Sequence, residues 1–371
     1  MQIQHNELAL IRACLVNDDG FESMFREWES VAKIQALNFG ALRILPFLQK
    51  RLSDLNVGSL IEPELRRIHR YFWSKRQLQE VTIQESVMPL MKGIESVSLK
   101  GFALEKLAYM QGELRPFSDL DLLVSRSDFR LVDERVENFG LKYQGSNPAR
   151  SFEYLQHAKP YKGKHLDLDI HWTFFPLGID PGYDERIRQR ASIYQGRTGW
   201  LLPSPTDALI HTVLHGSRPD VVSPIRWLID AHLLVSRNEI DWKLLQEESK
   251  NLGLQVELEA GLAVLGEFTK KDFSFFSPRV RSVPTLHLAH MAARWSVKSS
   301  SLWVKRLARV FGSDLIMVRN ALAKDGRQFG LIRVTLSAIS ESVRELLSIL
   351  SANSISDVLT GKWATRESRS D

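Results

Sequence analysis

Two aspartates one residue apart are the side chains of this sequence best suited to chemistry. Asp119 and Asp121 stand in the apolar run 115–124, which reads RPFSDLDLLV. If this run is a strand, both carboxylates project to one face and Leu120 and Leu122 to the other. Neighbouring carboxylates repel each other unless a cation lies between them or water reaches both. Mg²⁺ suits such a pair because it takes oxygen ligands from carboxylates and substrate phosphates, and Mn²⁺ is the alternative.

A second run of residues could add a third carboxylate to Asp119 and Asp121. Residues 165–172 read HLDLDIHW, and this strict alternation predicts a strand with one polar and one apolar face. Asp167, Asp169 and His171 share the polar face, so either aspartate could supply a third carboxylate. His171 could orient a carboxylate, or it could be a structural histidine.

The elements that position these residues lie between two helical regions. We expect residues 1–95 to be mainly helical, with an apolar period near 3.6 over residues 22–55. Residues 96–202 alternate short strands and helices, and residues 203–350 return to helices after the start signal Ser204-Pro-Thr-Asp207. Residues 351–371 have the composition of a disordered tail. Within the middle part, the expected elements are a strand at 96–99, a helix at 102–111, a strand at 117–124 and a helix at 128–139.

The composition is that of an ordinary soluble protein. The chain has 371 residues, of which 44% are hydrophobic and 25% charged, so two or three domains are expected. Cys14 is the single cysteine, which excludes an internal disulfide and a cysteine metal site. No signal-peptide pattern and no apolar run of about 18 residues is present, so we expect a cytoplasmic protein without a membrane partner.

Positive charge is concentrated near the end of the chain. Residues 279–371 contain about 15 Lys or Arg against about 7 Asp or Glu, within a net charge of +5. Such a segment could bind RNA, a nucleotide or an acidic partner. A solvated helical face explains the same composition, and we favour it.

The order of these elements resembles the nucleotidyltransferase fold of the DNA polymerase β superfamily. Residues 99–104 (LKGFAL), 115–124 and 169–172 (DIHW) are similar to the signatures of an uncharacterised bacterial nucleotidyltransferase family. Residues 203–215 and 226–230 are similar to its helical part, so the resemblance covers roughly residues 20–240. It implies an α+β fold, with a small mixed polymerase β-like sheet flanked by helices and by N-terminal and C-terminal helical regions.

The resemblance also implies an activity. Asp119, Asp121 and Asp169 would be the catalytic residues and the metal ligands, and Asp169 is preferred to Asp167 because it matches the Asp-x-His-Trp pattern. The enzyme would transfer NMP, with ATP the expected NTP, to a hydroxyl or phosphate of a small molecule, a modified peptide or a protein. Pyrophosphate would leave from between two Mg²⁺ ions.

Three residues near the aspartates are expected to bind the nucleotide. Gly101 permits close approach of a phosphate to a helix N-terminus. The superfamily has Gly-Gly or Gly-Ser here, whereas Gly101 precedes Phe102, so Lys100 would supply the charge instead. Arg115 either contacts phosphate or neutralises the acidic residues.

A substrate cleft is expected around His171, His215, Arg226 and Asp230. His211 and His215 have the four-residue spacing of a zinc pair, but no third ligand accompanies them, so a place in the cleft is favoured. Their role in the cleft is what the resemblance implies.

Other functions remain open at this stage. The departure at Gly101 is compatible with a catalytically degenerate nucleotide-binding or regulatory protein, and an antitoxin-like protein that modifies its protein partner is another alternative. A nucleic-acid acceptor is less favoured because no RNA-binding module is recognisable. A purely structural protein is the least favoured, since it has no reason to keep three clustered carboxylates.

Overall fold

The structure is a computed structural model that describes residues 5–144, 157–175, 181–194, 200–216 and 225–276. The expected tail at 351–371, the basic segment at 279–371 and the helices expected after residue 276 lie outside the described residues. None of the helices within these ranges has the length and apolar character needed to cross a bilayer.

Seven strands form one mixed sheet in the order β3-β4-β5-β2-β1-β7-β6. The central strands β2 and β5 are parallel, as are β1 and β7, while β1 and β2 are antiparallel. The strands are β1 (Ser96–Leu99), β2 (Asp119–Val124), β3 (Lys142–Tyr143), β4 (Ala158–Lys162), β5 (Asp167–His171), β6 (Ser192–Ile193) and β7 (Trp200–Leu202).

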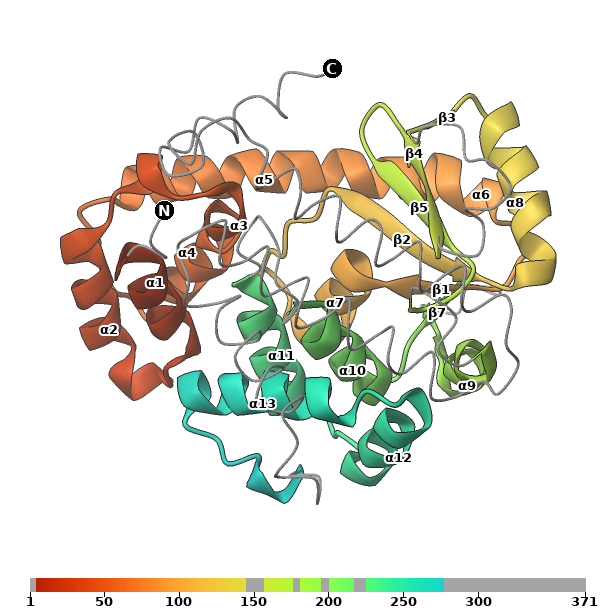
Figure 1. Cartoon of the computed structure of the whole chain (residues 1–371). Helices are drawn as coiled ribbons and strands as arrows, with labels where there is room; N and C mark the ends of the chain where they lie inside the picture. Colours follow the sequence, from red (N-terminus) through yellow and green to blue (C-terminus); the bar gives the residue numbers. More distant parts are fainter. Residues whose placement is uncertain (1–4, 145–156, 176–180, 195–199, 217–224, 277–371) are drawn as a thin grey trace, which may run out of the picture.

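Helices precede, interrupt and follow the sheet (Figure 1). Before it lie α1 (His5–Leu15), α2 (Asp18–Val31), α3 (Phe39–Leu42), α4 (Leu45–Asp54), α5 (Glu62–Thr82) and α6 (Met88–Leu90), with a 3₁₀ turn at Ile34–Ala36 and a π-helical turn at Ile83–Val87. Between strands lie α7 (Lys100–Ala108), α8 (Arg126–Asn138) and α9 (Pro181–Arg190). After the sheet come α10 (Pro205–Gly216), α11 (Arg226–Arg237), α12 (Trp242–Leu252), α13 (Gln255–Thr269) and the 3₁₀ turn Ser274–Phe276.

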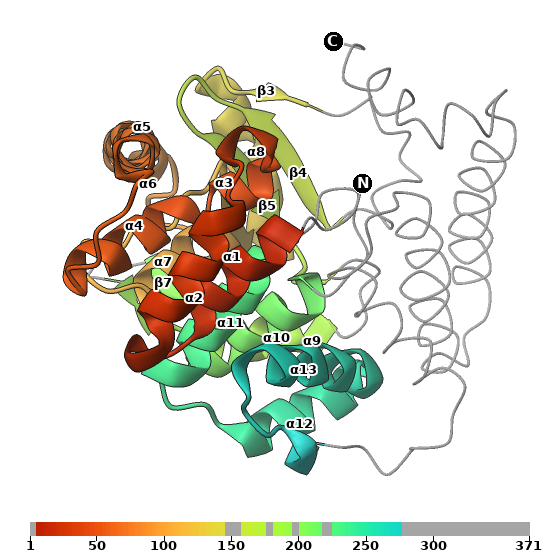
Figure 2. The same cartoon turned by 90° about the vertical axis from the view of Figure 1, so that its left-hand side faces the viewer.

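The two faces of the sheet belong to two hydrophobic clusters. Leu120, Leu122 and Leu168 pack in the cluster that includes Val132 and Val136 of α8. Leu123, on the opposite face, joins a larger cluster built from α1, α2, α4, α10, α11 and α13. The N-terminal and C-terminal helices therefore share one core, and both views show them adjacent (Figures 1 and 2).

Local signals set several helix ends. Ser204 accepts a hydrogen bond from the Asp207 backbone N–H at 3.1 Å, which is the N-terminal cap expected for α10. Ser125 caps α8 in the same way through the Asp128 N–H at 3.0 Å. The cap at Ser204 confirms the start signal predicted at residues 204–207. The cap at Ser125 was not predicted, and α8 begins at Arg126 rather than at residue 128.

The α+β class and the mixed sheet are confirmed, and the differences are local. The helix expected at 102–111 runs from Lys100 to Ala108, because Tyr109 is extended and Gly112 (φ +85°) turns the chain. The helical pattern at 22–55 is divided among α2, α3 and α4, since Asn38 caps a new helix through the Ala41 N–H. The polymerase β-like topology and the boundaries at 95, 202 and 350 stay proposals.

Candidate active site

The parallel pairing of β2 and β5 brings the predicted carboxylates together. Asp119 lies opposite Asp167, and Asp121 lies opposite Asp169. Alternation along each strand then puts Asp119, Asp121 and Asp169 on the same face. We call Asp119, Asp121 and Asp169 the carboxylate cluster. Asp121 is only 1% exposed, and the other two are half-buried.

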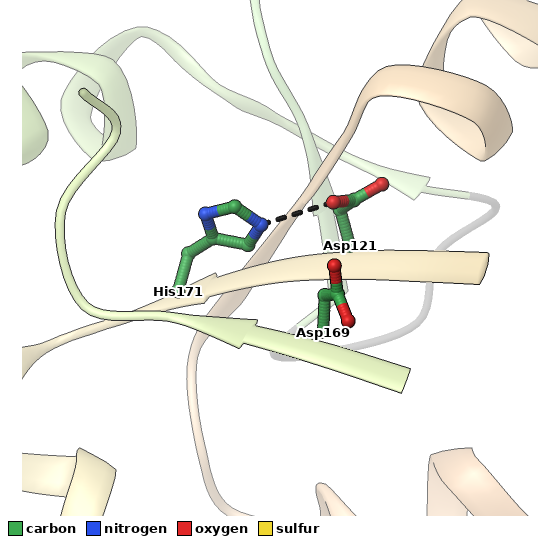
Figure 3. Close-up of side chains that lie close together, drawn as sticks. All are labelled: Asp121, Asp169 and His171. Atoms are coloured by element: carbon green, nitrogen blue, oxygen red, sulfur yellow. Dashed lines mark hydrogen bonds and ion pairs between the residues drawn. The ribbon is translucent and has the colours of Figure 1, made fainter. Parts of the chain in front are cut away.

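Asp121 is held by two nitrogen donors. Lys100 Nζ lies 2.5 Å from its Oδ1, and His171 Nε2 lies 2.9 Å from the same oxygen (Figure 3). Burial acts to raise the pKa of Asp121, but Lys100 and His171 outweigh it and hold the pKa well below its ordinary value of 3.8. Burial, and then the charge of Lys100, lower the pKa of His171, so its imidazole is neutral at pH 7.

Asp169 has the opposite environment. Its carboxylate accepts no hydrogen bond and makes no ion pair within the described residues. Burial, followed by the charges of Asp121 and Asp119, raises the pKa of Asp169 to about 7. Asp167, by contrast, pairs with Lys162 at 2.9 Å and accepts from the Gly163 N–H at 3.1 Å. Of the two rivals, Asp169 is the one beside Asp121 with oxygens available for a ligand.

Lys100 reaches Asp121 from a strained backbone position. It begins α7 with φ +44°, in the left-handed region that a side chain other than glycine rarely adopts. Burial acts to lower the pKa of Lys100, but the charge and hydrogen bond of Asp121 raise it overall. The ammonium therefore stays charged and supplies a positive charge where a metal ion would otherwise be needed.

The side chains fit a divalent cation. One carboxylate oxygen each from Asp121 and Asp169 and one imidazole nitrogen of His171 lie within 4.8 Å of one another. Carboxylates and imidazole are ordinary ligands of divalent ions, and the Lys100 ammonium shows that the position favours positive charge. The ligand set predicted from sequence was three aspartates, and Asp119 is not a member of this closest group.

A cavity of about 310 Å³ opens beside these residues, between β2, α7, α10, α11 and the end of α3. Most of the residues proposed for the nucleotide and the substrate cleft contribute to its wall. The lining includes Gly40, Arg43, Lys100, Gly101, Arg115, Asp119, Asp121, His211, His215, Arg226, Trp227 and Asp230.

Arg115, which also lines the cavity, forms a buried ion pair. Its Nε and Nη2 donate to the two oxygens of Asp230, each at 2.7 Å, and Tyr109 adds a hydrogen bond at 2.8 Å. Burial acts to raise the pKa of Asp230, but Arg115 outweighs it and the pKa lies below 3.8. Arg115 therefore neutralises Asp230 rather than the carboxylate cluster, and its Nη1 is buried without a partner in the described structure.

Two further arginines line the cavity without a carboxylate partner among the described residues. Arg226 donates from Nη1 to the Pro116 carbonyl at 2.6 Å, and Arg43 stacks on Phe39 at 4.2 Å. Burial and then the charge of Arg115 lower the pKa of Arg226 to about 9. We call Arg43, Arg115 and Arg226 the arginine cluster. Among the described residues, its three guanidinium groups have Asp230 as their single ion-pair partner, so the arginine cluster favours an anion.

Arg43 was missed by sequence reasoning. It belongs to the N-terminal helical region, about 75 residues before the carboxylates, and no motif surrounds it. Its contribution means that the N-terminal helices form part of the cavity wall.

Gly101 has a packing role. A Cβ there would lie 2.5 Å from Phe117 Cβ and 3.2 Å from Arg115 Nη1, so only glycine lets α7 approach the start of β2. This close approach positions Lys100 against Asp121.

His211 and His215 are neighbours on α10, with ring centroids 5.4 Å apart. His211 packs against Phe174 at 4.5 Å, and burial, then His215, lowers its pKa well below 6.5. Neither histidine belongs to a group of three metal-ligand side chains in the described part of the chain.

Comparison with known proteins adds one finding. A family model described as "uncharacterised nucleotidyltransferase" matches residues 28–270. No curated protein and no solved structure gives a significant match. The match spans α3, the carboxylate strands and α10 to α13, which are the elements around the cavity.

Proposed function

The chain belongs to an uncharacterised nucleotidyltransferase family, and we propose that it transfers AMP from ATP to a hydroxyl or phosphate of an acceptor. The observation that supports the proposal is that one cavity is lined by Asp119 and Asp121 of the carboxylate cluster and by the three residues of the arginine cluster. A nucleoside triphosphate complexed with a metal ion has this pattern, because its bound cation needs carboxylates and its outer phosphates need cations.

Asp119, Asp121 and Asp169 would hold the divalent ion, with Mg²⁺ the expected metal and Mn²⁺ the alternative. When bound, the ion supplies positive charge that offsets the carboxylates and the negative charge of the reacting phosphate. Lys100 would exchange its contact with Asp121 for one with a phosphate oxygen, since the incoming metal takes over the neutralisation of Asp121.

The chemical step follows from this placement. An acceptor oxygen forms a bond to the α-phosphorus of ATP while the bond from that phosphorus to the bridging oxygen breaks, and pyrophosphate leaves. Where the acceptor is a hydroxyl, the Asp169 carboxylate takes up its proton. Arg43 and Arg226 stabilise the charge that develops on the leaving pyrophosphate.

The wall of the cavity also bears on the acceptor. His215 of α10 and Trp227 of α11 also line the cavity. We propose that the acceptor enters along these helices. A small molecule, a modified peptide and a protein side chain all remain compatible with this entry.

The decisive experiment is a calorimetric titration of each NTP into the full chain with Mg²⁺, together with a pyrophosphate-release assay. We expect binding of ATP that requires Mg²⁺, and a loss of about a thousandfold in turnover for Asp121→Asn. Asp54→Asn is the matched control, because Asp54 is an exposed aspartate at the end of α4. ATP binding that is indifferent to both Mg²⁺ and Asp121 would contradict the proposal.

A second candidate rests on the Lys100–Asp121 contact, which occupies the carboxylate a metal would use. A nucleotide-binding regulatory protein without turnover would keep this ion pair when ATP binds. Titration with ATP in the absence of metal separates the two candidates. Metal-free binding that persists in Asp121→Asn, with no pyrophosphate release for any acceptor, would favour the regulatory protein.

A further inference from the structure

The group of side chains closest to a metal geometry is not the three aspartates. It consists of Asp121, Asp169 and His171, whose potential ligand atoms lie within 4.8 Å of one another (Figure 3). Asp119 instead accepts a hydrogen bond from Ser118 at 3.0 Å. An imidazole nitrogen thus stands where the ligand set expected from sequence has a carboxylate oxygen.

The strand geometry makes this arrangement rigid. Asp169 and His171 are two residues apart on β5 and share a face, and β2 is paired with β5 along its length. The imidazole is 1% exposed, as is the Asp121 side chain. In Figure 3 the His171 ring points its Nε2 toward the Asp121 carboxylate, with Asp169 beside them.

The separation of the two buried ligand atoms suits a shared cation. His171 Nε2 and Asp121 Oδ1 are 2.9 Å apart, which is a normal hydrogen-bond length. Two ligand atoms about 2.1 Å from one ion and at right angles to each other are separated by about 3.0 Å. A divalent ion can therefore replace the shared proton with little movement of either strand.

Two further observations favour a cation at this position. Asp169 has no hydrogen-bond or ion-pair partner in the described structure, so its oxygens are available. The Lys100 ammonium already lies against the oxygen of Asp121 that faces His171. Both observations indicate that this position favours a positive charge.

We propose that His171 binds the metal ion directly through Nε2, together with Asp121 and Asp169, and that this nitrogen makes the site prefer Mn²⁺ or a later first-row metal to Mg²⁺. Mg²⁺ takes oxygen ligands almost exclusively, whereas imidazole suits transition metals. The inference rests on the proposed function for its metal requirement, but it does not depend on the nucleotide or the acceptor.

Metal affinity alone does not test this proposal. Removing a residue that only orients a ligand already weakens metal binding by about 10-fold to 100-fold. A His171 that merely donates a hydrogen bond to Asp121 would have the same effect. The test therefore needs a direct measure of nitrogen coordination.

The experiment is pulsed electron paramagnetic resonance of Mn²⁺ added to the full chain without nucleotide. We expect a hyperfine coupling from an imidazole nitrogen in the wild type and its loss in His171→Gln. The glutamine keeps an amide N–H for Asp121 and offers only oxygen to the metal. His215→Gln is the control, because His215 lines the cavity outside the three-residue group and its replacement should leave the coupling unchanged.

The outcomes separate this inference from the proposed function. Bound Mn²⁺ without nitrogen coupling in the wild type overturns the inference, as does a folded wild type that binds no Mn²⁺. The proposed function survives either result if ATP still binds with Mg²⁺ in an Asp121-dependent way. Nitrogen coupling without any ATP binding would support the metal site and contradict the proposed function. A competition titration should give a preference of about tenfold or more for Mn²⁺ over Mg²⁺, reduced in His171→Gln.

Discussion

The carboxylate cluster and the arginine cluster differ in how their acidic side chains are stabilised. Asp230 accepts two hydrogen bonds from Arg115, each at 2.7 Å, and a third from Tyr109, so its charge is matched. In the carboxylate cluster, Asp169 has no hydrogen-bond or ion-pair partner in the described structure, although Asp121 and Asp119 lie beside it. The charge of Asp230 is therefore matched by its neighbours, whereas that of Asp169 is not.

The two clusters also differ in how their ion pairs connect the elements of the fold. The Arg115–Asp230 pair joins the turn before β2 to α11, and Arg237 of α11 reinforces the junction through an ion pair with Glu113. In the carboxylate cluster, Lys100 of α7 and His171 of β5 contact only Asp121, and Asp169 is left without such a contact in the described structure. Clustered like charges are costly to keep, and the proposed cation would relieve this cost.

The largest expected effect is a loss of stability when the Arg115–Asp230 ion pair is broken. Asp230→Asn should lower the free energy of unfolding by about 3 to 5 kcal/mol, because it leaves the Arg115 guanidinium buried and uncompensated. Urea denaturation followed by circular dichroism measures it. The double variant Arg115→Met/Asp230→Leu should recover most of the loss, and no recovery would contradict the pairing argument.

The same pair has a defined pH dependence. Because the pKa of Asp230 is lowered below 3.8 in the folded chain, its contribution is full above that pH. It is lost only as the pH falls through the folded-state pKa. The difference in stability between wild type and Asp230→Asn should therefore be constant from pH 5 to 7, to within about 0.5 kcal/mol.

The next effect concerns Gly101, which lines the cavity. Gly101→Ala should lower the free energy of unfolding by about 2 kcal/mol, because its Cβ would meet Phe117 Cβ at 2.5 Å. Gly58→Ala is the control, since a Cβ there meets no atom within 4 Å. Thermal unfolding of both variants is the measurement, and equal stabilities would contradict the packing role.

A smaller effect should appear in nucleotide binding at the arginine cluster. Arg43→Gln should weaken ATP binding about tenfold and AMP binding little, since the guanidinium is proposed to contact the outer phosphates. Arg130→Gln is the matched control because the Arg130 side chain is 90% exposed on α8. Calorimetry with both nucleotides decides the point, and an equal loss for AMP and ATP would argue against a phosphate contact.

The smallest expected effect has the opposite sign. Asp169→Asn should raise the free energy of unfolding of the metal-free chain by about 1 kcal/mol, because it relieves repulsion from Asp121 and Asp119. Asp167→Asn on the same strand should not raise the free energy of unfolding, since Asp167 already has Lys162 as a partner. Denaturation of both variants in the presence of a chelator is the measurement. A loss of stability for Asp169→Asn would contradict the argument that Asp121 and Asp119 repel it.

Much of the carboxylate cluster was predictable because the positions of its residues depend on local periodicity. Alternation in the runs at 115–124 and 165–172 placed Asp119, Asp121, Asp167 and Asp169 on polar strand faces, and the strands β2 and β5 confirm these assignments. The preference for Asp169 over Asp167 came from the Asp-x-His-Trp resemblance. The structure adds the pairing of Asp169 with Asp121 and the Lys162 partner of Asp167, which periodicity does not contain. The roles of the chosen residues in catalysis remain predictions.

The arginine cluster and its contact with Asp230 were much less predictable. Arg115 and Asp230 are 115 positions apart, and Arg43 lies in another region of the chain, so no local pattern connects them. The prediction for Arg115 considered phosphate or the acidic residues as partners, whereas the fold supplies Asp230. Long-range ion pairs depend on how helices pack against the sheet, and packing is set by the whole core rather than by any one segment.

The sequence by itself therefore determined the elements, their polar faces and the family to which the chain belongs. Those properties follow from spacing along the chain, because helix and strand periods act over a few residues. Only the tertiary structure decided which charges meet: Asp121 with Lys100 and His171, Arg115 with Asp230, and Arg43 with the cavity. The physical reason is that charge interactions depend on distance and burial in three dimensions, which sequence separation does not specify.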